Sequence, residues 1–361
     1  MVNKLTHQWT NFISTTGTDF ADSLSISKDG SIYVTGKIGG SLYGEQYMGG
    51  EDIYVSKFSS NGIHSWTKLF GTLEHDGGRS LTVSGDGSIY IVGYTQGNLD
   101  DQVNKGGFDD GFIIKLDPDG NKKWTKLIGS NGSDRAHGVE IASDGSIYVC
   151  GITTGDLNGE NNSGGDDAFV AKFNSAGTHV WTQLLGTLEN ESADFINLSN
   201  DGSIYVSGGT YGDLEGEINN DGRADAYVSK LSPEGEKIWT KLLSSSSSGS
   251  EWGKDIAVNS EGSIYQVASW GGDGILTKFS PDGTIEWSKV IQTSEHDNSE
   301  SVTISEDGYI YVTGETNGDL NGQTNIGEFD GYVSKFTPNG DLLWTELFGS
   351  YSDDFPHAID I

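Results

Sequence analysis

Short runs in which hydrophobic and polar residues alternate recur along the whole chain. One stretch of the sequence holds four of them in succession: residues 24–26, 31–35, 53–58 and a segment that begins near Trp66. Alternation with a period of two predicts β-strands that bury one face. We name the four strands of such a stretch A, B, C and D, and the pattern predicts an all-β protein built from four-stranded units.

Tryptophans mark the period of this pattern. They open near-identical segments at positions 9, 66, 124, 181, 239, 287 and 344, with spacings of 57, 58, 57, 58, 48 and 57 residues. A regular period of this length is typical of the blades of a β-propeller. We therefore expect a single propeller domain over residues 1–361, with repeats near 9–65, 66–123, 124–180, 181–238, 239–286 and 287–343 and a partial copy at 344–361.

Tight turns join strands A to B and C to D in each repeat. Asp-Gly or Glu-Gly pairs such as Asp29-Gly30 follow strand A, and segments such as Asp117-Pro118-Asp119-Gly120 follow strand C. Glycine supplies the positive φ that such hairpin turns require. Each repeat is therefore predicted to form one antiparallel four-stranded blade.

The number of expected strands leaves the closure of the ring open. A strand D (8–13) precedes the first blade and a strand A (357–361) follows the sixth, which makes 26 strands. Six blades use 24 of them, whereas seven blades would leave the last one without its two middle strands, a gap that hydrogen bonding does not cross. We favour sixfold closure, with a sevenfold ring that contains an incomplete blade as the alternative.

The repeat resembles the bacterial seven-bladed β-propeller repeat family. The shared pieces are the Asp-Gly-Ser-Ile-Tyr-Val of strand B, the Asp-Ala-Tyr-Val-Ser-Lys-Phe type of strand C and the Gly-x-x-x-Trp-Thr that opens strand D. The resemblance covers nearly the whole chain and implies a propeller. It implies little about activity, because propellers support many unrelated functions.

The composition restricts the partners and the compartment. Acids outnumber bases by 53 to 21 and the net charge is −32, so binding to nucleic acid or to an anionic membrane is electrostatically opposed. No apolar stretch approaches the roughly 18 residues that span a bilayer, and no signal peptide is evident. The single cysteine, Cys150, stands in a strand and is expected to be a small buried residue. We expect an extracellular or cell-surface protein exported without a signal peptide, with the cytoplasm as the alternative.

Two residues recur in strand C of every repeat, an Asp at its start and a Lys five positions later. The pairs are Asp52 and Lys57, Asp110 and Lys115, Asp167 and Lys172, Asp225 and Lys230, Asp273 and Lys278, and Asp330 and Lys335. The odd spacing places the two side chains on opposite faces of the strand. We expect the Asp to accept hydrogen bonds from turn amides and the Lys to lie along a neighbouring blade, with the D-strand tryptophans wedged between blades.

The B–C loops are candidate calcium sites. Oxygen-bearing side chains alternate along three of them, at Asp156, Asn158 and Glu160, at Asp213, Glu215 and Glu217, and at Asp319, Asn321 and Gln323. Hard cations such as calcium bind six to eight oxygens of this kind. The glycine at the fourth position of these loops does not match an EF-hand, so solvated turns without a metal are the alternative.

The fifth repeat departs from the others. Its B–C loop is shortened to a few residues, and its D–A loop contains Ser244–Ser248. It also has two tryptophans, Trp252 and Trp270, at positions where the other repeats have none. Aromatic faces beside a low loop suit a sugar or a peptide side chain. The alternative is that both tryptophans pack the blade-five interface in place of the lost loop.

A third candidate is the residue that leads into strand A. It differs between copies and is Asp22, Arg79, His137, Asp194, Lys254, Glu300 and His357 in turn. We expect these side chains to surround the mouth of the channel, either as ligand contacts or as solvated positions.

No catalytic signature stands out. The seven histidines lack metal-binding spacing, and neither a nucleophile elbow nor a phosphate-binding loop occurs. We predict a non-enzymatic binding, adhesion or scaffolding protein that engages a carbohydrate or protein on its acidic loops, with calcium as the one cofactor indicated. The alternatives are a structural domain of a larger surface assembly and a polysaccharide hydrolase or lyase that uses acids such as Asp22 or Asp194. Nothing in the sequence indicates the oligomeric state.

Overall fold

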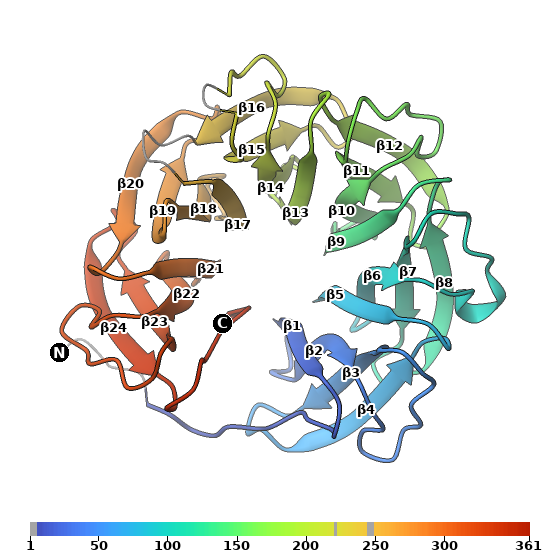
Figure 1. Ribbon diagram of the computed structural model, residues 1–361, viewed down its shortest axis with the longest axis horizontal. Coiled ribbons are helices and arrows are strands. Elements are labelled where there is room, and N and C mark those ends of the chain that lie inside the picture. The colour runs from blue at the N-terminus through green and yellow to red at the C-terminus, as the bar shows by residue number, and fades with distance from the viewer. Residues whose placement is uncertain (1–5, 220–221, 244–248) are drawn as a thin grey trace. The chain divides into compact units, whose positions relative to one another are not determined.

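A computed structural model describes residues 6–219, 222–243 and 249–361. These residues form six four-stranded sheets, and in each sheet the order of the strands is the same as their order in the sequence (Figure 1). The predicted fold class, an all-β propeller with six four-stranded antiparallel blades, is confirmed. Within the described ranges, one short 3-10 turn, η1 (Leu99–Asp101), is the only helical element.

The strands of the first three blades are β1 Asp19–Ile26, β2 Ile32–Ile38, β3 Asp52–Phe58 and β4 His64–Phe70; β5 Asp76–Val83, β6 Ile89–Thr95, β7 Asp110–Leu116 and β8 Lys122–Ile128; and β9 Asp134–Ile141, β10 Ile147–Thr153, β11 Asp167–Phe173 and β12 His179–Leu185. Those of the last three are β13 Glu191–Leu198, β14 Ile204–Thr210, β15 Asp225–Leu231 and β16 Lys237–Leu243; β17 Glu251–Val258, β18 Ile264–Trp270, β19 Asp273–Phe279 and β20 Ile285–Ile291; and β21 Asp297–Ile304, β22 Ile310–Thr316, β23 Asp330–Phe336 and β24 Leu342–Phe348.

The contacts divide the chain into two compact units. The N-terminal unit, residues 8–193, contains the first three blades, and the C-terminal unit contains residues 194–361. The division falls within β13.

The A–B turns are fixed by a serine, an aspartate and a glycine. In the first blade Asp29 Oδ1 accepts hydrogen bonds from Ser27 Oγ at 2.6 Å and from the Ser31 amide at 3.0 Å, while Gly30 adopts φ +79°. The same bonds hold the pKa of Asp29 down at about 2, with Ser27 as the largest cause. The Asp-Gly turns predicted from the sequence therefore form hairpins.

Each blade contains a stack of lysine, tyrosine and tryptophan, and within each unit the tryptophan of the stack packs on the next blade. In every blade the B-strand tyrosine lies with its ring centroid 6.1 or 6.2 Å from that of the D-strand tryptophan. The C-strand lysine lies over the same tyrosine ring, with Nζ 4.8 to 5.6 Å from the centroid. Lys57 also reaches the Pro118 carbonyl of the next blade at 3.5 Å, and Trp66 covers Gly120 there. The role predicted for the tryptophans is confirmed within each unit, and that predicted for the lysines is confirmed at Lys57 and Lys230.

The C-strand aspartates cap the loop that precedes them. Asp52 and Asp110 each accept a backbone amide at 2.7 Å, from Met48 and Lys105 respectively. Both side chains are fully buried, and burial raises the pKa of each to about 6. A nearby strand-A carboxylate, Asp76 or Asp134, adds to the increase. The predicted role of these aspartates as acceptors of turn amides is confirmed.

The two surplus segments at the chain ends lie against blades without joining a sheet. In the N-terminal unit, Trp9 Nε1 donates to the Ser60 carbonyl at 3.3 Å, and Trp9 covers Gly62 as Trp66 covers Gly120. In the C-terminal unit, the Ile359 amide donates to Ser301 Oγ at 3.3 Å. These segments therefore occupy the places of strands D and A of a neighbouring blade, but they are not paired strands.

Cys150 lies fully buried in β10 as a free thiol, which confirms its predicted place in a strand. No helix among the described residues has the length and hydropathy needed to cross a membrane.

The capping aspartates predict an unusual dependence of stability on pH. Because folding raises the pKa of Asp52 and Asp110, the folded state binds protons more tightly than the unfolded state. The free energy of unfolding should therefore increase as the pH falls from about 7.5 to about 5, by on the order of 2 kcal/mol for each residue. Denaturant unfolding at several pH values measures this change.

Asp110→Asn is the matched variant, since its amide oxygen still accepts the Lys105 amide but cannot titrate. It should reduce the gain in stability at low pH. An unchanged pH dependence in Asp52→Asn and Asp110→Asn together would contradict this assignment. Below about pH 4 stability should fall again, because the A-B turn aspartates, whose pKa values are lowered, become protonated.

Candidate ligand-binding site

A β-bulge occurs in the first strand of the blades. The register of β1 against β2 shifts between Ala21 and Ser23, which leaves Asp22 as the extra residue. The corresponding shifts leave Arg79, His137, Lys254 and Glu300 as extra residues in β5, β9, β17 and β21. A bulge redirects the side chain of the extra residue and leaves the rest of the ladder in place. We call these positions, together with Asp194 of β13 and His357 of the C-terminal segment, the bulge positions.

The sequence predicted that these residues lead into strand A, and this detail is wrong. β1 begins at Asp19 and β5 at Asp76, so Asp22 and Arg79 lie within their strands. The bulge interrupts the alternation of polar and apolar residues, and therefore only the second half of strand A was visible in the pattern.

Bulge residues of adjacent blades form ion pairs within each unit. Arg79 Nη1 lies 3.5 Å from Asp22 Oδ1, and Lys254 Nζ lies 3.1 Å from Glu300 Oε1. All four side chains are partly exposed, so these weak pairs leave their charges accessible to a ligand. The structure thus brings four of the predicted site residues together as two pairs.

Aromatic and charged neighbours of the bulges were missed in the sequence. In the N-terminal unit, the Tyr94 ring of β6 lies 5.6 Å from the guanidinium carbon of Arg79 and 5.2 Å from that of Arg135. Lys37 of β2 lies 4.8 Å from the centroid of the exposed Phe20 ring. The signal that could have revealed these residues is the same one that marked the bulges, a position that differs between otherwise similar repeats.

The bulge of β21 adjoins a buried polar cluster in the C-terminal unit. Asn298 Nδ2 donates to Glu315 Oε1 at 3.1 Å and also to Glu300 Oε1. Burial raises the pKa of Glu315, and the Glu300 carboxylate adds to this, whereas Lys254 and His357 act in the opposite direction. Glu315 Oε2 is buried without a hydrogen-bond partner. This group is therefore a second candidate acceptor for a ligand.

The candidate calcium loops use their oxygens in other contacts. Asp156, Asp213 and Asp319 each accept a backbone amide six residues later, at 2.9 to 3.0 Å. Asn158 and Asn321, which have positive φ, donate to the D-strand hydroxyls of Thr182 and Thr345. Glu215 and Glu217 pair with Lys237 and Lys241 at 2.5 and 2.6 Å, while the backbone of Glu160 pairs with that of Leu157. Within the described part of the chain, no three acidic, histidine or cysteine side chains converge as a metal site would require.

Calcium binding by these loops is tested by thermal unfolding with millimolar calcium and with a chelator. Because the loop oxygens already accept hydrogen bonds or pair with lysines, we expect the same Tm in both. A Tm raised by calcium in the native chain but not in Asp213→Asn would show that the loops bind the ion, and Asp307→Asn on an A–B turn is the control.

The two additional tryptophans pack against blades four and five. Trp252 covers Gly209, where a Cβ atom would lie 2.3 Å from the indole, and its ring lies 5.8 Å from that of Tyr211. Trp270 packs on the buried cluster that includes Ile256 and Phe279. The short link between β18 and β19 is the pair Gly271-Gly272, while Ser244–Ser248 lie outside the described residues. The contacts account for both tryptophans by packing, and contact with a ligand stays a prediction.

The packing role of Trp252 is tested by removing its side chain and measuring the stability of the fold. Trp252→Ala should lower the free energy of unfolding by about 2 kcal/mol, because it opens the surface over Gly209. Urea unfolding measures the loss, and Trp252→Phe should restore most of it. If Trp252→Ala leaves stability unchanged, the packing role is contradicted.

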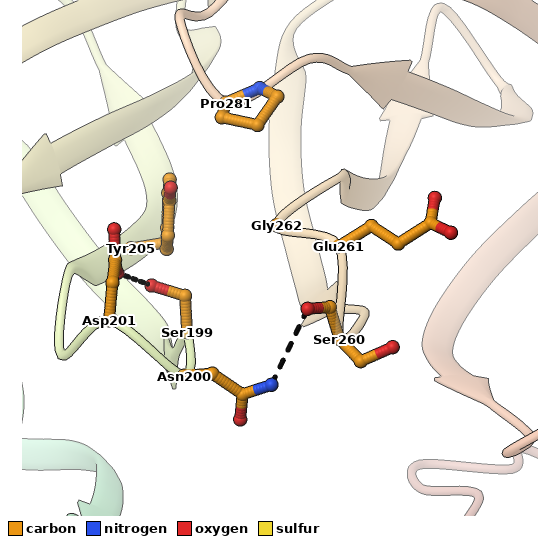
Figure 2. A pocket seen from close by; sticks show the side chains of 8 residues that line it. All are labelled: Ser199, Asn200, Asp201, Tyr205, Ser260, Glu261, Gly262 and Pro281. Carbon is orange, nitrogen blue, oxygen red and sulfur yellow. Dashed lines mark hydrogen bonds between the residues drawn. The ribbon is translucent and has the colours of Figure 1, made fainter.

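A small pocket is lined by residues of blades four and five (Figure 2). Its volume is about 180 Å³, and it lies between the A–B turns, where Asn200 Nδ2 donates to the Ser260 carbonyl at 3.4 Å. Asp201, Glu261 and Pro281 also line it. These are turn residues whose type recurs in most blades, so the pocket offers little chemistry of its own.

The strand order and the repeated interface define a β-propeller, and comparisons with known proteins agree. The family model of the SBBP β-propeller repeat matches residues 65–100 and 287–321. The resemblance predicted from the sequence is therefore confirmed.

Two curated relatives share part of the chain. The regulatory protein FlaEY of Caulobacter vibrioides is 27% identical over 188 residues, which is 46% of this chain and 20% of the relative. An uncharacterized WD repeat-containing protein, L264, of Acanthamoeba polyphaga mimivirus is 26% identical over 295 residues, 72% of this chain and 20% of the relative. The chain thus spans about a fifth of the length of these relatives.

Among solved structures, an ulvan lyase, a polysaccharide lyase determined with -[GlcA(1-4)Rha3S]- bound, is similar with a TM-score of 0.55 and 12% identity. The match covers 88% of this chain and 80% of the lyase. At this identity the likeness shows the fold alone.

Proposed function

We propose that this chain is a non-enzymatic binding domain whose ligand contacts the bulge positions and the loops beside them. The observation that carries the proposal is the contrast between constant and variable positions. Each blade keeps the same lysine, tyrosine and tryptophan stack, while the bulge residue changes between Asp, Arg, His, Lys and Glu. Variable residues on a rigid framework are typical of a recognition surface.

The loops next to the bulges support this proposal because they are rigid and carry exposed apolar side chains. The D–A loop bonds to the B–C loop of the preceding blade, as in the Asp76 amide to the Glu51 carbonyl at 2.8 Å. At the tips of the D–A loops, Leu73, Leu188 and Tyr351 are 81 to 88% exposed. Further exposed apolar side chains on the B–C loops are Tyr43, Met48, Val103, Phe108, Ile218 and Ile326. Apolar groups on an otherwise acidic surface suit a protein or carbohydrate ligand.

The nature of the partner follows from charge. A net charge of −32 opposes nucleic acid and anionic membranes, so a carbohydrate or protein ligand outside the cell or on its surface is proposed.

A polysaccharide lyase or hydrolase is the second candidate function. The observation in its favour is the buried Glu315, whose pKa is raised and which lies beside Glu300 and Lys254. A buried carboxyl group with a raised pKa beside a second carboxylate is typical of acid–base catalysis.

A glycan array, followed by titration of any glycan that binds, tests the binding function. We expect binding by the native chain and a loss of about tenfold or more in a variant with its bulge charges removed: Asp22→Asn, Arg79→Gln, Lys254→Met and Glu300→Gln. Lys126→Met and Lys289→Met on the D strands form the matched control, because they change charge without touching the bulges.

Two results would contradict the proposal. Equal binding by the native chain and the bulge variant would place the ligand elsewhere. Degradation of a polysaccharide that is lost in Glu315→Gln would favour an enzymatic function instead. Absence of binding to any glycan or protein ligand would favour a purely structural domain.

A further inference from the structure

Arginine is rare in this chain, and its placement is uneven. Only three arginines occur among 361 residues, whereas lysine occurs eighteen times. Two of the three, Arg79 and Arg135, lie in the first strands of adjacent blades and face one tyrosine, Tyr94. Because guanidinium groups bind carboxylates through paired donors, this arrangement differs in kind from the lysines of the repeat.

The tyrosine is held so that both guanidinium groups meet its ring. Tyr94 pairs across the strands with Gly77, where a Cβ atom would lie 2.7 Å from the ring, so glycine is required there for the ring to fit. The ring is 7% exposed. A fixed aromatic surface next to a guanidinium group favours stacking.

Arg135 is held in place by a buried partner. Its Nε and Nη2 both lie 2.5 Å from Asp109 Oδ2, and Asp109 is fully buried and also accepts Gln96 Nε2 at 3.1 Å. The Arg135 side chain is nevertheless 35% exposed, so part of the guanidinium group stays accessible. Such preorganisation lowers the entropic cost of binding.

Arg79 is less constrained than Arg135. Its one ion pair, with Asp22, is long at 3.5 Å, and its side chain is 39% exposed. Its Nε is covered and has no hydrogen-bond partner. A ligand carboxylate next to the exposed parts of both guanidinium groups would be attracted by both charges.

We propose that Arg79 and Arg135, stacked on Tyr94, form a subsite for the carboxylate of a hexuronic acid in an acidic polysaccharide. The proposal rests on the proposed binding function and names its ligand class. A sugar is favoured over an acidic peptide because the exposed Phe20 of the adjacent blade, 42% exposed with Lys37 over its ring, offers an apolar face for a pyranose. The repulsion from the acidic chain is screened beyond about 8 Å at physiological salt, so local contacts decide binding.

The probe is a trigalacturonate, titrated by calorimetry at physiological salt, with its methyl ester as the uncharged control. We expect the acid to bind and the ester to bind about tenfold more weakly. Arg79→Gln should weaken binding of the acid by about tenfold, to the level of the ester. Arg223→Gln, at the third arginine, should leave binding unchanged.

Arg135→Gln would leave Asp109 buried without its cation, so a loss of binding in this variant would not distinguish unfolding from the loss of a ligand contact. Arg135→Lys with a measured Tm is therefore the second variant, and it should fold and still bind more weakly, because lysine lacks the paired donors. Equal affinity for acid and ester, or an Arg79→Gln variant that binds like the native chain, would overturn the subsite. Binding of polyglutamate in place of the uronate would overturn the sugar assignment.

The two proposals fail in different ways. If neutral glycans bind and depend on Lys254 and Glu300 while the uronate does not bind, the arginine subsite is wrong and the binding function stands. If no ligand depends on any bulge position, both are wrong.

Discussion

Each blade of this protein has two faces to bury, and burial of the second face depends on the next blade. The lysine, tyrosine and tryptophan stack satisfies this requirement within both units. The tryptophan of strand D covers the C–D turn of the following blade, while the lysine lies on the tyrosine and reaches toward the same turn. Because this contact is the same wherever two blades meet within a unit, the residues that make it cannot vary without weakening the packing. The proposed ligand contacts are therefore restricted to the positions that the stack leaves free.

Those positions lie at the bulges and in the loops beside them. The B–C loops close on themselves through aspartates that accept amides six residues later, and through contacts with strand D of the same blade. Such loops lose little entropy when a ligand binds. The oxygens that made them candidates for calcium are the same atoms that stabilise this conformation.

The repeat allowed the fold to be predicted from the sequence, whereas the candidate site could be predicted only in part. Tryptophan spacing, Asp-Gly turns and the recurring Asp and Lys predicted the blades and their interface, because these features are determined locally and occur six times. The start of strand A was placed too late, since the bulge at Asp22 and its equivalents breaks the alternation. Trp252 and Trp270 were recognised as exceptions, but their contacts with Gly209 and the core depend on tertiary packing that one sequence does not encode in a readable pattern. Tyr94 and Glu315 were missed because their importance arises only when strand B brings them beside a bulge, and Asn298 was missed because it acts only through its contacts with Glu300 and Glu315.

The bulge has a consequence for how such a chain can change. It inserts its residue between two intact stretches of ladder, so the strand keeps its register whatever side chain is inserted. A substitution at a bulge position therefore changes the side chain at the surface of the blade without changing the pairing of its strands. Duplication of a blade therefore adds a surface position whose side chain is free to change on the same scaffold. A library randomised at the codons for these few positions would vary the exposed side chains while the rest of the gene remained constant.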